Sequence, residues 1–132
     1  MVTNQLATHA PTMLGVLRIM AGLLFCAHGA QKFLSFPPGD MAGAGWAFSS
    51  PGHFAGVIEL VCGALIALGL FTRPAAFLAS GTMAVAYFMA HASKNLWPVN
   101  NGGDAAILYC FVFLYLVFAG AGSLSLDSRL RR

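Results

Sequence analysis

Charge is the scarcest property of this 132-residue chain. Charged residues make up 8% of it and hydrophobic residues 58%. A soluble domain typically carries about 25% charged residues, so these few charges cannot cover a water-facing surface. The sequence also lacks a nucleic-acid-binding motif and a compact metal-ligand spacing such as His-x-x-x-His. We therefore expect a membrane protein that binds no nucleic acid and has no metal site.

Cysteine is sparse as well. The three cysteines, Cys26, Cys62 and Cys110, lie in three different apolar stretches and form no Cys-x-x-Cys pair. That distribution predicts no disulfide framework. It suits cysteines that act as small buried apolar residues.

Four long apolar stretches dominate what remains, at about residues 13–33, 54–71, 74–92 and 105–121. About 20 apolar residues match the hydrocarbon thickness of a bilayer. The sequence therefore predicts an all-α fold, a polytopic membrane four-helix bundle that forms a single transmembrane domain over residues 1–132. Residues 34–53 are rich in glycine and proline and predict an irregular outer loop.

The distribution of basic residues predicts the orientation. Lys32 and Lys94 fall at one side of the four stretches. Five arginines fall at the other side, which holds both termini and the second loop: Arg18, Arg73, Arg129, Arg131 and Arg132. Because cytoplasmic loops carry the excess of basic residues, both termini are expected in the cytoplasm. Arg18, about one turn inside the first stretch, is expected to extend its side chain to the headgroups.

The ionisable residues within the stretches gather toward the outer side. At 1.5 Å per residue, His28 lies about 8 Å below the outer end of the first stretch and Glu59 roughly 8–10 Å below the outer start of the second. The set comes from all four stretches: His28, Lys32, Glu59, His91 and Asp104. We expect these side chains to converge in one polar pocket near the outer face.

Glu59 is the strongest single signal in the set. A charged residue in an apolar span costs about 2.5–3.5 kcal/mol on insertion scales, and such residues are usually functional or paired. Gly52, Gly56 and Gly63 share its helix face, and small residues mark helix–helix contacts in membranes. Glu59 should therefore face the interior, either in a structural salt bridge with Lys32 or a histidine, or, with His28, as a catalytic residue.

The remaining polar residues are binding candidates. They are Lys32, Gln31, His91, Tyr87 and Asp104. The alternatives are that His91 is merely hydrated and that Asp104 is a helix cap. The last stretch is rich in aromatic residues, which could hold a quinone head group or simply pack against helices and lipid.

The motifs together resemble the DoxX family of small four-helix bacterial membrane proteins. The resemblance runs from about Leu14 to Asp127, ends in Gly120-Ala121-Gly122-Ser123-Leu124-Ser125-Leu126-Asp127, and also includes His28, Lys32 and Glu59. Its structural motif residues are Arg18, Gly29, Gly63, Arg73, Gly122 and Asp127. Two positions depart from the family pattern, because Ala121 replaces the usual proline and Asp104 stands where glutamate is common.

This resemblance implies a multi-pass protein of the bacterial cytoplasmic (inner) membrane that is associated with redox systems. The leading prediction is an accessory subunit of a quinone- or thiol-linked redox system, with quinone as the cofactor. Its expected partners are the lipid bilayer, a redox enzyme and a second copy of the chain. The alternatives are a small-solute or proton-coupled carrier and a structural assembly subunit.

Overall fold

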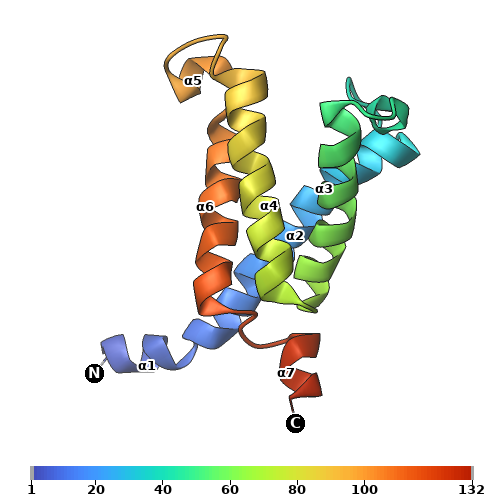
Figure 1. Cartoon of the computed structure of the whole chain (residues 1–132). Coiled ribbons are helices and arrows are strands. Elements are labelled where there is room, and N and C mark those ends of the chain that lie inside the picture. Colours follow the sequence, from blue (N-terminus) through green and yellow to red (C-terminus); the bar gives the residue numbers. More distant parts are fainter. Residues whose placement is uncertain (1, 132) are drawn as a thin grey trace.

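The computed structural model describes residues 2–131, and every regular element in that range is helical (Figure 1). The α-helices are α1 (Val2–Thr8), α2 (Ala10–Leu34), α3 (Pro51–Leu68), α4 (Thr72–Ala86), α5 (Pro98–Asn101), α6 (Asp104–Ala119) and α7 (Leu126–Leu130). A 3-10 turn, η1 (Ala44–Trp46), follows α2, and a π-helical segment, η2 (Tyr87–His91), continues α4. The predicted all-helical class is confirmed.

The four predicted apolar stretches correspond to α2, α3, α4 with η2, and α6. Local capping chemistry sets several of their ends. Ser50 begins α3 by accepting a hydrogen bond from the His53 amide at 3.1 Å, as a serine N-cap does. Gly69 ends α3 with a φ of 68°, a conformation that glycine adopts at little cost. Of these helices, α2 and α3 are long and apolar enough to cross a membrane, and α6 is apolar but shorter.

The short elements were not predicted. Residues 2–8 form α1, and η1 interrupts the predicted irregular loop of residues 34–53. Neither α5 nor α7 has an apolar stretch of its own, since they contain four and five residues. Helices this short leave no readable hydrophobic period and form only where neighbouring elements hold them.

Glycines bring α2 and α3 into close contact. A Cβ atom on Gly22 would lie 2.5 Å from the amide nitrogen of Ala67, and one on Gly63 would lie 2.6 Å from that of Cys26. Neither position can hold a larger side chain without a shift of backbone. The small residues thus fix the separation of these helices, as they do in membrane helix pairs.

A second pair, α4 with α6, packs through small side chains of α4. Ala75, Ala76 and Ala79 are buried. Ser80 donates a hydrogen bond to the carbonyl of Cys110 in α6 at 2.8 Å. Phe25 of α2 contacts Phe113 of α6 edge to face, with ring centroids 4.8 Å apart, and this contact joins the two pairs in the core.

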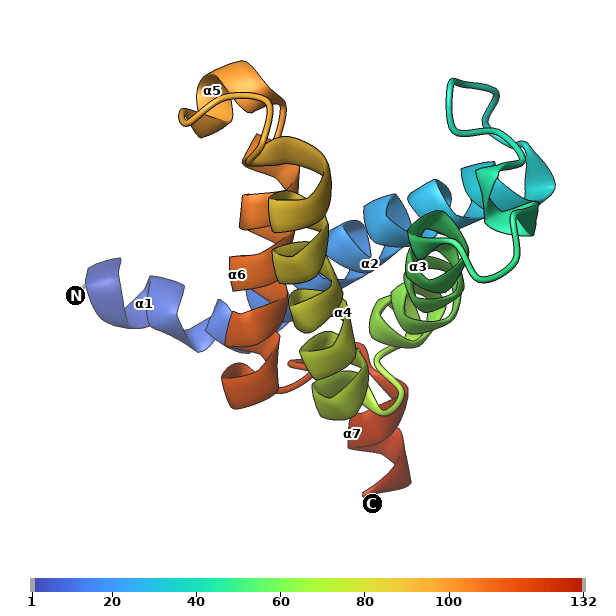
Figure 2. The same cartoon turned by 45° about the horizontal axis from the view of Figure 1, so that its top comes forward.

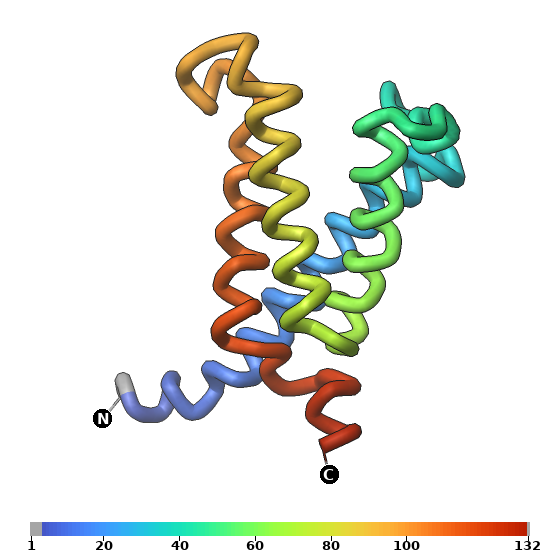
Figure 3. The backbone as a smooth tube through the Cα atoms, in the orientation of Figure 1, coloured from blue at the N-terminus to red at the C-terminus, as the bar shows by residue number. Residues whose placement is uncertain are grey.

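The two pairs lie close at one end and diverge toward the other, as the cartoon and the backbone tube show (Figures 1, 2 and 3). The close end holds both termini, α7 and the turn from α3 to α4. At the open end, η1 lies over α2 and α3, whereas α5 lies over α4 and α6. This divergence determines which of the predicted site residues can meet.

Large apolar side chains cover the outside of the helices. Examples that are more than half exposed are Leu23, Leu24, Val61, Phe77, Phe111 and Phe118. The fully buried set instead includes a charged residue, Arg18. An apolar exterior around a partly polar interior is the arrangement that a hydrocarbon environment favours.

Candidate functional site

A buried ion pair joins α2 to α3. The Lys32 ammonium lies 2.7 Å from Glu59 Oε1 and 2.6 Å from Oε2. The two residues are 9% and 4% exposed. Gly56 makes room for the lysine stem, because a Cβ atom there would lie 3.2 Å from Lys32 Cδ. The prediction that Glu59 faces the interior rather than lipid is confirmed.

Lys32 and Glu59 interact only with each other through their side-chain polar groups within the described residues. Within residues 2–131, neither Lys32 nor Glu59 makes a side-chain hydrogen bond to any other group. Both carboxylate oxygens are therefore occupied, whereas an ammonium has three hydrogens to donate. Two charges removed from water in this way are held by each other, and losing either one leaves the other uncompensated. Chemically, the pair can hold a proton, exchange it, and donate one further hydrogen bond.

Aromatic side chains lie beside this pair. His28 precedes Lys32 by one helical turn on α2 and packs edge to face against Tyr109 of α6, with centroids 6.1 Å apart. Tyr109 also contacts Phe25 at 5.6 Å. The sequence reasoning counted Tyr109 only among general aromatic surface. Its depth was the available signal, because it lies five residues, about 8 Å, below the start of α6.

The residues predicted near the outer face form a different cluster. His91 Nδ1 lies 3.0 Å from the carbonyl oxygen of Asn101, and the Asn101 amide donates to the Tyr87 hydroxyl at 3.0 Å. The Asn101 side chain also accepts from the Gly103 amide at 2.8 Å. Asn101 is 4% exposed and was missed, since an asparagine in a glycine-rich turn gives no sign of burial. This cluster fastens α5 to the π-helical end of α4.

The predicted single convergence of five ionisable side chains is wrong. Lys32 and Glu59 meet, but His28, one helical turn before Lys32, is exposed. No hydrogen bond or ion pair within the described range connects the pair to His28 or His91. Asp104 is exposed at the start of α6. The helix pairs diverge toward this end (Figure 1), so a similar position along the helices does not bring these side chains together.

Gln31 also lies apart from the ion pair. Its amide donates to the carbonyl of Pro37 at 3.0 Å, which ties the end of α2 to the following loop. The predicted binding role of Gln31 receives no support from this contact.

Arg18 is the other buried charge, and its expected extension to the headgroups is wrong. The residue is 0% exposed. Its guanidinium donates to five carbonyl oxygens at 2.7–3.3 Å, which belong to Ile66, Ala67, Ala121, Ser123 and Leu124. It thereby satisfies the last carbonyls of α3 and the loop that leads to α7. Five donors in a fixed plane suit this task, which lysine could not perform.

The other motif residues close the same end of the molecule. Asp127 accepts from the amides of Phe71 at 2.9 Å and Thr72 at 3.0 Å. Arg73 donates to the carbonyls of Val117 and Phe118 at 2.7 and 2.8 Å. These contacts cap the start of α4 and the end of α6.

Gly122 and Gly29 permit close approaches of backbone. A Cβ atom on Gly122 would lie 2.8 Å from the carbonyl oxygen of Pro11, and one on Gly29 would lie 2.8 Å from that of Gly56. With Gly63, these glycines act in packing rather than in chemistry.

The Asp127 carboxyl lies outside the apolar helices, and its environment favours the charged form. Burial by itself would raise its pKa, but the hydrogen bonds from Thr72 and Phe71, together with the charge of Arg131, hold the pKa below its ordinary value. The carboxylate is therefore ionised at neutral pH and stabilises the start of α4.

The donor chemistry gives no metal centre within residues 2–131. No group of three or more His, Cys, Asp or Glu side chains there is placed to hold a metal ion. Cys26, Cys62 and Cys110 are all free thiols.

Comparisons with known proteins agree with this arrangement. The DoxX family model matches residues 13–92, which hold most of α2 and all of α3, α4 and η2, with both members of the ion pair. An uncharacterized protein of Haemophilus influenzae is 45% identical over 130 residues, covering 96% of each chain. An uncharacterized membrane protein of Mycobacterium tuberculosis is 28% identical over 143 residues, covering 96% of this chain and 86% of the relative. No solved structure matches the chain. On the family match and these relatives, the chain belongs to the DoxX family of membrane proteins.

Proposed function

We propose that this protein is an accessory subunit of a quinone- or thiol-linked redox system, and that the Lys32–Glu59 pair is its working centre. The observation that carries the proposal is a closed, titratable ion pair buried between apolar helices. Intramembrane ionisable residues are costly and usually lie on proton or ligand pathways.

The neighbouring side chains fit a quinone head group. A quinone is a flat ring with two carbonyl oxygens, so it needs an aromatic surface and a hydrogen-bond donor. Tyr109 is half-buried and offers the aromatic ring, with the fully buried Phe113 stacked behind it at a centroid distance of 5.6 Å. The unused ammonium hydrogen of Lys32 is the donor. A bound quinol would supply two-electron, two-proton redox chemistry. A partner enzyme would take the electrons, Glu59 would accept one proton, and His28 would accept the other.

The same proposal includes a four-span topology with both termini in the cytoplasm. Residues 72–91 form one continuous rod of roughly 30 Å at 1.5 Å per residue, and the 16 residues of α6 cover about 24 Å. The cytoplasmic placement follows from the arginines at the end that holds the termini. In this orientation the ion pair lies in the outer half of the membrane.

A binding titration tests the proposal. The full chain in detergent micelles is titrated with a short-chain ubiquinone, and binding is followed by tryptophan fluorescence. We expect saturable binding that weakens about tenfold or more in Glu59→Gln, because Lys32 then loses the carboxylate that holds its ammonium group in place. Asp104→Asn neutralises an exposed carboxylate and is the matched control, which should bind like the wild type. Absence of saturable binding, or equal binding by the wild type and Glu59→Gln, would exclude the quinone site.

A structural assembly role is the second candidate, because both oxygens of Glu59 are already occupied by Lys32. In that role the charges only hold α2 against α3. The variant Lys32→Met/Glu59→Leu should then assemble with its redox partner as the wild type does and support the same turnover. Loss of turnover with intact assembly would favour the proton-exchange role.

A further inference from the structure

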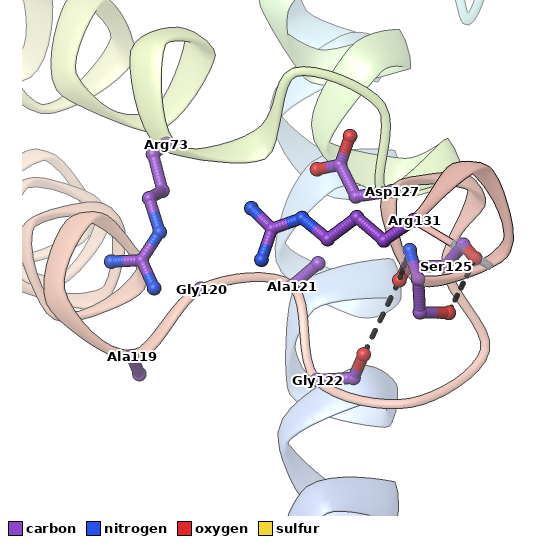
Figure 4. Close-up of a pocket in the computed structure, with 9 residues that line it drawn as sticks. Arg73, Ala119, Gly120, Ala121, Gly122, Ser125, Asp127 and Arg131 are labelled. Carbon is purple, nitrogen blue, oxygen red and sulfur yellow. Dashed lines mark hydrogen bonds between the residues drawn. The ribbon is translucent and has the colours of Figure 1, made fainter.

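An open pocket of about 360 Å³ lies at the end of the molecule that holds both termini. It is bounded by the start of α4, the loop after α6, and α7 (Figure 4). Arg73 reaches it from α4 and Arg131 from the end of α7, and their guanidinium groups point toward one another across it (Figure 4). The Lys32–Glu59 pair takes no part in this pocket.

Arg73 is held in place while part of its guanidinium stays free. Its Nη1 donates to the carbonyls that end α6. Its Nη2 lies beside Gly120, where a Cβ atom would be only 3.0 Å away. The absence of a side chain at Gly120 therefore leaves space next to N–H groups that make no other hydrogen bond within residues 2–131.

The second guanidinium is also available. Arg131 makes no side-chain hydrogen bond and no ion pair with any residue in the described part of the chain. Asp127 is the acidic side chain that lines the pocket, and both of its oxygens accept amide hydrogen bonds from the start of α4. Two guanidiniums against one engaged carboxylate leave the pocket with a net positive charge.

Exposed apolar side chains occur at the same end of the protein as the pocket. Phe71 is 64% exposed and Leu130 is 75% exposed. Phe71 stands two residues before Arg73, and Leu130 directly precedes Arg131. Apolar side chains next to arginines are typical of segments that lie at the boundary between headgroups and acyl chains. A membrane lipid fits this boundary better than a free anion in solution.

We propose that Arg73 and Arg131 bind the phosphate group of an anionic phospholipid at the membrane surface nearest the termini. A planar guanidinium matches phosphate oxygens through paired hydrogen bonds, and basic pockets at the ends of membrane helices bind anionic headgroups. The bound lipid would connect α4 to α7 through its headgroup. This site is independent of the proposed redox role.

A titration with water-soluble short-chain lipids tests the site. The full chain in neutral detergent is titrated at low salt with dioctanoyl phosphatidylglycerol, dioctanoyl phosphatidylcholine and inorganic phosphate, and binding is read by microscale thermophoresis. Arg131→Gln is the test variant. Arg129→Gln is the matched control, because it removes the same charge only two residues away, at a residue that lines a different pocket. Circular dichroism checks that both variants keep the helical fold.

We expect phosphatidylglycerol to bind more tightly than phosphatidylcholine. Arg131→Gln should weaken the binding about tenfold, as the loss of one charge-assisted contact does, whereas Arg129→Gln should change it less than about threefold, the scale of a screened surface charge. Equal weakening by the two variants, or no preference for phosphatidylglycerol, would overturn the site. Inorganic phosphate that binds as tightly as the lipid would overturn the assignment to a lipid.

Discussion

The two buried cations within residues 2–131, Arg18 and Lys32, are stabilised in opposite ways. Arg18 is surrounded by five neutral carbonyl oxygens, whereas Lys32 is neutralised by one carboxylate. An arginine stays protonated at any physiological pH, so the contacts of Arg18 with the carbonyl oxygens are a permanent structural link. The Lys32–Glu59 pair contains two groups that can gain or lose a proton. Burial of a charged residue therefore does not by itself identify a functional site. The chemistry of the group that binds the charge distinguishes a functional residue from a structural one.

The largest effect on the free energy of unfolding should follow from removing the Arg18 guanidinium. Arg18→Met leaves five carbonyl oxygens without their donor, and we expect a loss of about 4 kcal/mol in unfolding free energy, within the range for breaking a buried charged network. Reversible unfolding in mixed micelles measures it. A change below about 1 kcal/mol, the value typical of an exposed contact, would contradict the structural role.

Replacing one member of the ion pair should destabilise the protein more than replacing both members. Glu59→Leu alone leaves Lys32 buried and uncompensated and should cost about 3 kcal/mol of unfolding free energy. Adding Lys32→Met should restore stability to within about 1 kcal/mol of the wild type, because an apolar pair of similar volume replaces the ions. The same unfolding assay checks both. Additive losses in the double variant would show that the two residues act separately.

The helix contact that places these charges can be tested with a matched glycine pair. Gly22→Ala places a methyl group against the backbone of α3 and should cost about 2 kcal/mol of unfolding free energy through overpacking. Gly81→Ala in α4 meets open space and should be neutral or up to about 1 kcal/mol more stable, since alanine favours the helix. Equal effects at the two sites would argue against close packing of α2 on α3.

The smallest effect concerns the carboxylate that caps α4. Asp127 has a lowered pKa in the folded protein, so its stabilisation is present above the ordinary aspartate pKa and is lost as the pH falls through the lower folded value. Asp127→Asn should cost about 1 kcal/mol at neutral pH, as for the loss of a helix cap. It should also flatten the dependence of unfolding free energy on pH below about 4. An identical pH dependence in both proteins would remove this assignment.

The sequence allowed the helices to be predicted, because four apolar stretches with turns between them leave few alternatives. It also placed Glu59 toward the interior, since Gly56 and Gly63 share its face and mark the side that packs. What it could not show was the rotation and splay of the helix pairs. His91 lies with Asn101 on the other pair.

The carbonyl partners of Arg18 could not be predicted from the sequence either. Backbone carbonyls are present at every residue, so no sequence pattern marks the ones that a distant arginine will bind. The closing segment near Asp127 carried a family motif, but its contacts with the start of α4 depend on a turn that only the folded chain defines.

The most direct test of the central claim is the rate of quinol oxidation against pH in membranes that contain the assembled redox system, comparing the wild type with Lys32→Met/Glu59→Leu. The variant keeps α2 and α3 packed but holds no exchangeable proton at this position. We predict that assembly persists while the rate falls at least about tenfold, on the scale of a lost acid–base group, and its pH dependence disappears. An unchanged rate with an unchanged pH profile would contradict the proposed role of the ion pair.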